Sequence, residues 1–358
     1  MKIFVTGAAG FIGSYVSRAL VLRGDDVVGY DNFHSYYPRN CKEFNVDLTY
    51  LAAGRKTRFF PQQQIEPIYK KLDSISSFSK SDKKTGYYEF VEGDIVNYDF
   101  LEYLFDKEKF DAVIHLAAMA GVPFSIRDPR LYTSVNLDGT TNLLNLSTLN
   151  NIKNFVFASS SSVYGNSDKV PFKENELENK PISPYAATKL AGEVLCHTFN
   201  YNFGLNISCL RFFTVYGPLQ RPYGMAIQRF VNYVFRDIPL TIFGDGSMAR
   251  DYTYVEDTVK GILGALDNVQ KYEIYNLGNS APVTLNNLVK EIEAAVGKKA
   301  IITNVDRPST EVNITFADIT KANKMFGYKP TMDVSEGIKR QVEVYRMMPE
   351  WYRNLAIV

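Results

Sequence analysis

The sequence contains few cysteines and histidines, and neither sign of charge predominates. Its 358 residues include 3 cysteines and 3 histidines, and 40 basic residues balance 39 acidic ones, for a net charge of +1. Because basic and acidic residues are nearly equal in number, the charge does not point to nucleic acid or an anionic membrane as the main partner. Because the scattered cysteines show neither disulfide nor metal-ligand spacing, we expect no metal site and a reducing compartment, the cytoplasm.

Long apolar runs and internal repeats are also missing. No apolar stretch reaches the roughly 20 residues that a helix needs to cross a bilayer. The chain opens on a predicted strand without a signal peptide, so we expect no membrane attachment. With 46% hydrophobic residues the chain can still bury a large core, enough for one large domain or two modest ones.

The amino-terminal segment has the pattern of a dinucleotide-binding turn. Residues 2–6 (KIFVT) are typical of a buried strand, and TGAAGFIG follows at once, before a segment with helical periodicity. The glycines allow a tight turn and let backbone amides approach a pyrophosphate at the helix amino terminus. The residues predicted to form this part of the site are Gly7, Gly10, Phe11, Ile12 and Gly13.

The second predicted strand, residues 26–30, ends at Asp31 and Asn32. An acidic residue at this point hydrogen-bonds the adenosine ribose in dinucleotide folds. A 2′-phosphate would be repelled by the carboxylate of Asp31. The sequence therefore predicts NAD rather than NADP as the cofactor.

A second stretch, SPYAATKLAGE, places Tyr185 and Lys189 four residues apart on one face of a predicted helix. A phenol is a poor base because its pKa is about 10. An ammonium group one turn away and a cationic nicotinamide ring would favour the phenolate. Tyr185 can then exchange a hydroxyl proton while a hydride moves to the cofactor. Such pairs also occur on solvated helices, but the dinucleotide pattern in the same chain favours the catalytic interpretation.

Predicted strands and helices alternate through the first two thirds of the chain, which is typical of an α/β fold, a Rossmann-type doubly wound parallel sheet. We assign residues 1–210 mainly to an NAD-binding domain. Residues 211–358 are assigned mainly to a smaller, interleaved α/β substrate domain, some segments of which return to the first. Residues 44–86 break the alternation and are predicted to be an insertion or long loop, with one short helix near residues 66–72. This segment is either a solvated surface or a cover for the active site.

Several stretches together resemble the extended short-chain dehydrogenase/reductase family, over about residues 1–345. They are TGAAGFIG, Asp31, GDI, HLAA, the serine tract before VYG, SPYAATK, RFFTVYGP and RDYTYVED. Within that family the chain is most similar to UDP-glucuronate 4-epimerases, in DNFHSYY, AAMAGVPFSI, SSSSVYG, FTVYGPLQRP and ADITKANKMFGYKP.

The resemblance implies redox-neutral 4-epimerisation of a UDP-sugar with a tightly held NAD. Tyr185 would take the proton of the sugar C4 hydroxyl while C4 gives its hydride to NAD. The 4-keto sugar would then turn over and receive the hydride on its opposite face. Ser160 stands at the catalytic serine position and Lys189 would bind the nicotinamide ribose. Further cofactor contacts are implied for Asp94, Ile95 and Ala117.

A glucuronate substrate adds a chemical hazard, because a 4-keto sugar with a carboxylate on C5 loses carbon dioxide readily. In similar enzymes hydroxyl groups and an arginine restrain the carboxylate. The matching residues here are Ser161, Ser162, Thr214 and Arg221. Related 4,6-dehydratases carry an Asp-Glu pair where this chain has Ser161 and Ser162, so dehydration is not expected. Decarboxylation needs no acid and stays an alternative.

Nucleotide anchoring is implied for two arginines. Arg250 would neutralise the diphosphate, and Arg307 would do the same or hold the uridine ribose. Glu311 is a candidate replacement for the aspartate that usually follows this second arginine. Val122 and Pro123 depart from the Val-Arg common in glucuronate epimerases, which bears on the choice of sugar.

Other functions remain open at this point. One alternative is 4-epimerisation of a neutral UDP-hexose or UDP-N-acetylhexosamine, although such enzymes usually carry Asn where Thr214 stands. A non-enzymatic NAD-binding sensor is disfavoured because Tyr185 and Lys189 are both present. A predicted helix at residues 136–149 would pack beside the Tyr185 helix, and this pair of helices is the expected interface of a homodimer.

Overall fold

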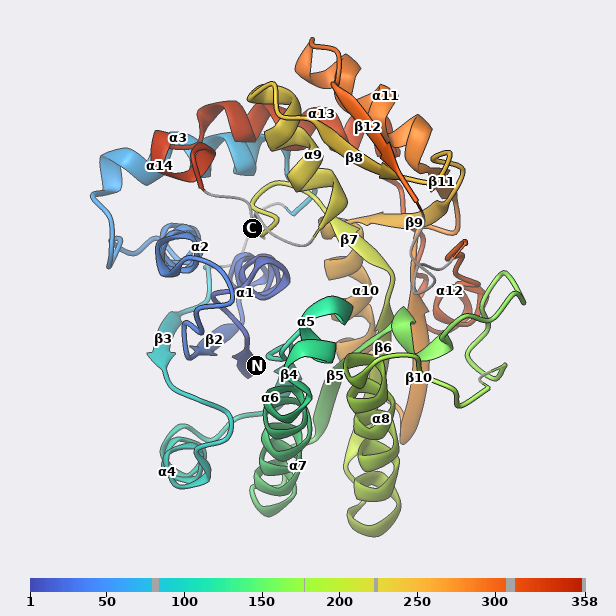
Figure 1. Cartoon of the computed structure of the whole chain (residues 1–358). Coiled ribbons are helices and arrows are strands. Elements are labelled where there is room, and N and C mark those ends of the chain that lie inside the picture. Colours follow the sequence, from blue (N-terminus) through green and yellow to red (C-terminus); the bar gives the residue numbers. More distant parts are fainter. Residues whose placement is uncertain (79–83, 177, 222–224, 307–312, 356–358) are drawn as a thin grey trace.

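The computed structural model describes residues 1–78, 84–176, 178–221, 225–306 and 313–355. Its centre is a parallel seven-stranded sheet (Figure 1). The strands are β1 (Lys2–Thr6), β2 (Asp26–Asp31), β3 (Tyr88–Glu92), β4 (Ala112–His115), β5 (Asn154–Ser160), β6 (Asn206–Phe212) and β10 (Tyr272–Leu277). Their spatial order is β10-β6-β5-β4-β1-β2-β3, so the order reverses between β1 and β4. In open sheets of this kind ligands bind beside such a reversal, at the carboxyl ends of the strands.

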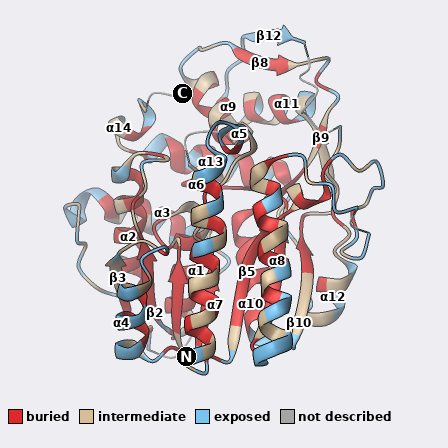
Figure 2. Cartoon of the chain, turned by 60° about the horizontal axis from the view of Figure 1, so that its bottom comes forward, coloured by how far each residue is buried: buried red, intermediate tan, exposed pale blue. Residues whose placement is uncertain are grey.

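Helices cover both faces of this sheet, and Figure 2 shows the buried strands between them. The first face carries α1 (Phe11–Arg23), α2 (Arg39–Ala52), α3 (Gln62–Ile75) and α10 (Val255–Asp267). The second carries α4 (Tyr98–Glu108), α7 (Gly139–Leu149) and α8 (Pro184–Phe203). Val5 packs into the first core and its neighbour Phe4 into the second, because successive side chains of a strand point to opposite faces. The expected Rossmann-type α/β fold is therefore confirmed.

Residues 44–86 are not a long loop, which corrects the prediction for this segment, but the short helix predicted near residues 66–72 is present within α3. They contain most of α2 and all of α3, and α2 packs against α1 with Phe44, Val46, Leu48 and Tyr50 buried. These apolar residues alternate with polar ones that are also buried, so the segment lacks the 3.6-residue period by which a helix is recognised. The Asp47 carboxylate accepts backbone N–H groups of residues 58–60 and so holds the connection to α3.

The chain after β6 forms smaller layers above the carboxyl ends of the main strands (Figure 1). Strands β7 (Thr214–Tyr216), β9 (Ala249–Tyr254) and β11 (Pro282–Thr284) form one sheet, and β8 (Leu240–Phe243) pairs with β12 (Ile302–Val305). The helices here are α9 (Ala226–Phe235), α11 (Leu285–Val296), α12 (Thr320–Phe326), α13 (Val334–Met347) and α14 (Glu350–Arg353). Because β10 and α10 return to the main sheet, the chain passes back between the layers. A domain boundary near residue 210 remains a prediction.

Short helical segments connect the main elements beside the carboxyl ends of β4 and β5. They are α5 (Val122–Arg127), α6 (Pro129–Thr133), the π-helical turn η1 (Ser134–Asp138) and the 3₁₀ turn η2 (Ser161–Tyr164). Across the described ranges, none of the helices is long and apolar enough to span a bilayer.

Candidate active site

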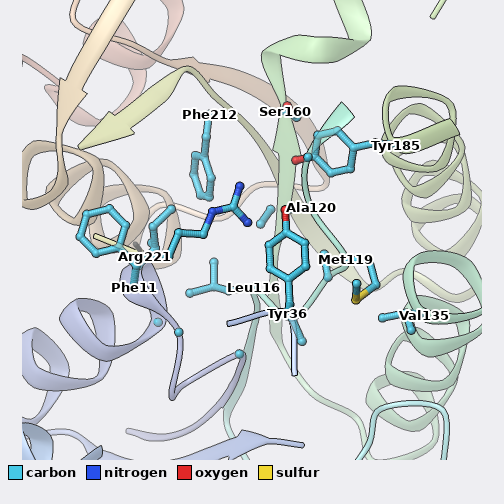
Figure 3. A pocket seen from close by; sticks show the side chains of 18 of the residues that line it. Phe11, Tyr36, Leu116, Met119, Ala120, Val135, Ser160, Tyr185, Phe212 and Arg221 are labelled. Atoms are coloured by element: carbon cyan, nitrogen blue, oxygen red, sulfur yellow. The ribbon is translucent and has the colours of Figure 1, made fainter. Parts of the chain in front are cut away.

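A cavity of about 450 Å³ lies at the carboxyl ends of the central strands, beside the reversal between β1 and β4 (Figure 3). Most of the residues predicted from the sequence line it. They are Gly7, Gly10, Phe11, Ile12, Gly13, Asp31, Asn32, Asp94, Ile95, Ala117, Ser160, Ser161, Ser162, Tyr185, Lys189, Thr214 and Arg221. The fold therefore brings both predicted patterns, the glycine turn and the Tyr-Lys pair, to one site.

Three predicted residues are not among those that line the cavity. Arg250 lies on β9 and donates a hydrogen bond to its own neighbour, the Ala249 carbonyl oxygen, at 3.0 Å. Arg307 and Glu311 lie outside the described residues. The nucleotide-binding roles of all three stay predictions.

The glycine side of the cavity comprises Gly7, Gly10, Gly13, Asp31, Asn32 and Asp94, which follow β1, β2 and β3. Gly7 has φ +70°, and a Cβ atom at Gly13 would lie 2.1 Å from the Gly7 carbonyl oxygen, so the turn accepts glycine only. Helix α1 begins without a side-chain cap and without an acidic residue in its first turn. Its first amide groups are thus open to an anionic group, and the cradle fits a dinucleotide pyrophosphate.

The acidic residues on this side are held by contacts with their neighbours. Asp31 accepts hydrogen bonds from the Phe33 backbone at 2.8 Å and from Lys42 at 3.3 Å, in a buried ion pair. The Asn32 amide donates to Asp94 at 2.8 Å, which links the ends of β2 and β3. Sequence reasoning missed Lys42, because nothing in its spacing from Asp31 indicates an ion pair. This carboxylate-rich wall fits a ribose with free hydroxyls and disfavours a 2′-phosphate.

The tyrosine side comprises Ser160, Ser161, Ser162, Tyr185, Lys189, Thr214 and Arg221, which follow β5 and β6 or lie on α8. Helix α8 begins at Pro184, where the Ser183 hydroxyl accepts the Ala186 N–H at 3.1 Å. This start places Tyr185 in the first turn, at the cavity wall. Lys189 lies one turn later, and its ammonium group donates to the Ala158 carbonyl oxygen at 2.7 Å.

The electrostatics of Tyr185 differ from the expectation in one respect. Burial raises the pKa of Tyr185 above 10.0, and the influences that lower it are a hydrogen bond with Ser160 and the charge of Arg221. Lys189 is not among them, and burial lowers the pKa of Lys189 itself to about 8. In the chain alone the phenol is therefore favoured, so the shift toward phenolate depends on further positive charge such as a nicotinamide ring.

The serine tract ends β5 and turns into the cavity. Ser160 donates from its hydroxyl to the Ser162 hydroxyl at 3.0 Å and accepts the Ser162 N–H at 3.2 Å. These bonds orient the tract toward Tyr185, as Figure 3 shows for Ser160. A hydroxyl and a phenol thus meet at one point, where both can contact the same substrate oxygen.

A buried ion pair fixes the catalytic helix on the sheet. Arg211 of β6 binds both carboxylate oxygens of Glu193 of α8, at 2.9 and 2.7 Å, and the two side chains are 1% and 2% exposed. Glu193 also accepts the Ser159 hydroxyl at 2.5 Å, so it ties α8 to β5 as well. Because Glu193 follows Lys189 by one turn, this anchor sets the height of Tyr185 and Lys189 above the strand ends.

His115 ends β4 beneath the cavity and is a packed strand-end histidine. Its Nδ1 lies 2.8 Å from the Thr6 hydroxyl and its Nε2 lies 3.0 Å from the Thr140 hydroxyl. The Thr140 hydroxyl donates to the Asn136 carbonyl oxygen, so it accepts from Nε2–H, and Nδ1 accepts from Thr6. Burial lowers the pKa of His115 to about 3, which keeps the ring neutral.

The fold and this cavity together define a dinucleotide-binding enzyme in which a Tyr-Lys pair lies beside a glycine turn. Residues 3–278 match the sequence model of the NAD dependent epimerase/dehydratase family. The chain belongs to this family, so its cofactor is NAD. The resemblance to the extended short-chain dehydrogenase/reductases is thereby confirmed.

Individual relatives narrow the comparison. The chain is 40% identical to UDP-glucuronate 4-epimerase 1 of Arabidopsis thaliana, over 96% of this chain and 76% of that protein. It superimposes on the UDP-glucuronic acid 4-epimerase of Bacillus cereus in complex with UDP-glucuronic acid and NAD, with a TM-score of 0.80 and 34% identity, covering 97% and 100% of the two chains. A UDP-glucose 4-epimerase of Thermotoga maritima with UDP-glucose also has a TM-score of 0.80, at 31% identity and 97% and 99% coverage.

Proposed function

We propose that the protein is an isomerase that interconverts UDP-glucuronate and UDP-galacturonate by NAD-dependent 4-epimerisation. The observation that carries this choice is the charge of the tyrosine side. It presents Arg221, Lys189 and four hydroxyl-bearing Ser and Thr residues, and among its described lining residues there is no carboxylate. A cationic, hydroxyl-rich wall favours an anionic sugar over a neutral one.

In this proposal Tyr185 exchanges the proton of the C4 hydroxyl, and Ser160 hydrogen-bonds the same oxygen. When bound there, NAD would supply a reversible acceptor for the hydride of C4. Lys189 holds the nicotinamide ribose, and the glycine turn with Asp31 holds the rest of the dinucleotide. Because C4 regains the hydride and its hydroxyl oxygen regains the proton, the reaction needs no added oxidant.

The same wall also restrains the sugar carboxylate. Ser161, Ser162 and Thr214 offer hydroxyl donors, and Arg221 offers a charged one. Held out of line with the C4 ketone, the carboxylate keeps its bond to C5. The described tyrosine side also lacks an acid for dehydration, so epimerisation is the outcome favoured over the alternatives.

Proton NMR of the purified protein with UDP-glucuronate, without added cofactor, tests the proposal. UDP-galacturonate without release of carbon dioxide would support the reaction, the substrate and a resident NAD together. A pentose product would identify a decarboxylase instead. No reaction, even with NAD supplied, would move the assignment to a neutral UDP-sugar, to be tested with UDP-glucose and UDP-N-acetylglucosamine.

A homodimer and a cytoplasmic location complete the proposal. Helices α7 and α8 lie side by side (Figure 1), and the apolar side chains Leu149, Val194 and Tyr201 on them are 62%, 59% and 81% exposed. Such exposed apolar groups favour a surface that is covered by a second copy. The three cysteines are buried and unpaired, which favours a reducing compartment. Sedimentation velocity would test the dimer.

A further inference from the structure

Arg221 reaches the tyrosine side of the cavity from a loop, and its main contact there is an aromatic ring. The centre of its guanidinium group lies 4.7 Å from the centroid of the Tyr36 ring. Figure 3 shows the guanidinium extending into the cavity between Phe212 and Tyr36, toward Ser160 and Tyr185. An arginine stacked on a ring face keeps its in-plane N–H donors for another partner.

Within the part of the chain that the structure describes, no carboxylate forms an ion pair with Arg221, and none of its N–H groups has a hydrogen-bond partner. Arg221 is half-buried at the cavity wall, where solvent screens its charge less than on an open surface. The ring of Tyr36 attracts the charge without neutralising it. The guanidinium is therefore held in place and remains able to bind an anion.

Tyr36 is itself fixed from two directions. Its ring meets the Phe124 ring edge to face, with centroids 5.3 Å apart. Its hydroxyl lies against Gly121, where an added Cβ atom would be 2.7 Å away. Gly121 has φ +102°, a conformation that favours glycine and here leaves room for the phenol. Hence the position of the ring is determined before any ligand binds.

The backbone of Tyr36 continues the chain of contacts from the glycine side. The Tyr36 N–H donates to His34 Nδ1 at 3.1 Å, and the His34 N–H donates to the Asn32 side chain at 2.9 Å. Thus one loop after β2 contributes Asp31 and Asn32 to the glycine side and sends a ring across to Arg221. Sequence reasoning placed no role on Tyr36, although the aromatic stretch DNFHSYY stands out in a loop.

We propose that Tyr36 is a positioning residue that sets the preference for an anionic sugar by holding the Arg221 guanidinium over the tyrosine side of the cavity. The ring face carries this role and the hydroxyl does not. The inference rests on the proposed function and adds to it a residue that acts through Arg221 rather than on the substrate.

The test compares Tyr36→Leu with Tyr36→Phe in the NAD-containing enzyme. For Tyr36→Leu we expect the KM and Kd of UDP-glucuronate to rise about tenfold, the size of effect that losing a partly desolvated cation–π contact gives. We expect kcat to change much less, and the Kd of UDP-glucose to stay near the wild-type value. Tyr36→Phe keeps the ring and should restore wild-type behaviour. Tyr103→Leu, an exposed tyrosine on α4, controls for the loss of a tyrosine elsewhere.

A double-mutant cycle confirms that Tyr36 acts through Arg221. In an Arg221→Ala background, Tyr36→Leu should cause almost no further loss of UDP-glucuronate binding. The inference would be overturned if Tyr36→Leu weakened the binding of UDP-glucuronate and UDP-glucose equally, or if Tyr36→Phe bound UDP-glucuronate as poorly as Tyr36→Leu. Additive losses of UDP-glucuronate binding in the double-mutant cycle would also overturn it. NAD content and melting temperature of each variant show that it is folded.

The failure of this inference is distinguishable from failure of the proposed function. If the wild type epimerises UDP-glucuronate but Tyr36→Leu keeps the wild-type preference for UDP-glucuronate over UDP-glucose, only the role of Tyr36 is wrong. If the wild type does not turn over UDP-glucuronate, calorimetric binding of the two UDP-sugars still measures whether Tyr36→Leu selectively weakens the anionic one. Selective weakening would support the role of Tyr36 even then, and uniform weakening would overturn it.

Discussion

On the glycine side of the cavity the backbone forms the binding surface, whereas on the tyrosine side the side chains form it. Gly7, Gly10 and Gly13 belong to one short turn, and their positions follow from backbone conformation and the absence of Cβ atoms. Tyr36, Ser160, Tyr185 and Arg221 come from four separate segments and are placed by contacts between side chains. The first surface accepts no added atoms, while the second can be altered one residue at a time.

The two sides also differ in charge. The glycine side carries Asp94 and Asp31, of which Asp31 pairs with Lys42, and the tyrosine side carries Lys189 and Arg221. A ligand with free ribose hydroxyls at one place and an anionic sugar at the other matches this distribution. Under the proposed function, cofactor choice and sugar choice rest on different residues, although the loop after β2 contributes to both sides. Single substitutions on one side should therefore leave the other side largely intact.

The largest expected effect is that of Tyr185→Phe, which should remove most of the turnover and leave cofactor binding on the glycine side unchanged. Loss of the phenolic proton acceptor should lower kcat by about 10²- to 10⁴-fold, the usual contribution of general acid–base catalysis. NAD content and melting temperature should not change. The measurement is turnover by NMR, with Tyr201→Phe, an exposed tyrosine on the same helix, as the matched control. A Tyr185→Phe enzyme with normal turnover would refute the catalytic assignment.

Arg221→Ala should affect the anionic sugar substrate much more than a neutral one. We expect kcat/KM for UDP-glucuronate to fall roughly 10- to 100-fold, because a hydrogen bond to a charged group contributes about 1.5–3 kcal/mol. The value for UDP-glucose should change far less. Parallel losses on both sugars would mean that Arg221 serves the nucleotide and not the carboxylate.

Gly13→Ala should affect the glycine side instead. The new Cβ atom would lie 2.1 Å from the Gly7 carbonyl oxygen, a backbone atom that cannot rotate away. We expect the free energy of unfolding to fall by about 1–3 kcal/mol, as for other overpacked sites, and the resident NAD to be lost.

Urea unfolding and the NAD released on denaturation measure both effects of Gly13→Ala. Gly204→Ala at the end of α8 also strains a positive φ, but its Cβ atom would meet nothing within 4 Å. This control should keep its NAD. Retention of NAD by Gly13→Ala would contradict the account of the turn.

The smallest effect is a pH dependence that arises at His115, beneath the cavity. Its pKa is about 3 in the folded chain against an ordinary 6.5, so the unfolded chain binds the extra proton as pH falls below 6.5. Stability from this residue is therefore present above pH 6.5 and declines below it, by about 1 kcal/mol near pH 5.5. The free energy of unfolding, measured with urea at several pH values, should fall more steeply between about pH 7 and 5 for the wild type than for His115→Gln. The same pH dependence of the free energy of unfolding in both proteins would show that His115 can take up a proton in the folded chain.

Local patterns carried most of the prediction on the glycine side. A glycine turn and the acidic end of the next strand lie within about thirty residues of each other, and their geometry follows from backbone conformation. The Tyr185–Lys189 spacing is likewise local, because helix geometry places residues four apart on one face. Helix α2 escaped prediction because buried polar residues such as Asp47 conceal its apolar pattern, whereas the short helix predicted near residues 66–72 lies within α3.

The sequence by itself determined the parallel α/β architecture, the glycine turn, the strand-end Asp31 and the helix that bears Tyr185, since each depends on neighbours within one or two elements. Only the tertiary structure decided that Arg221 stacks on Tyr36, that Lys42 pairs with Asp31, and that Arg211 anchors Glu193. These contacts join segments that are adjacent only after the sheet has formed. Their geometry depends on strand order and helix packing, which no single local pattern contains.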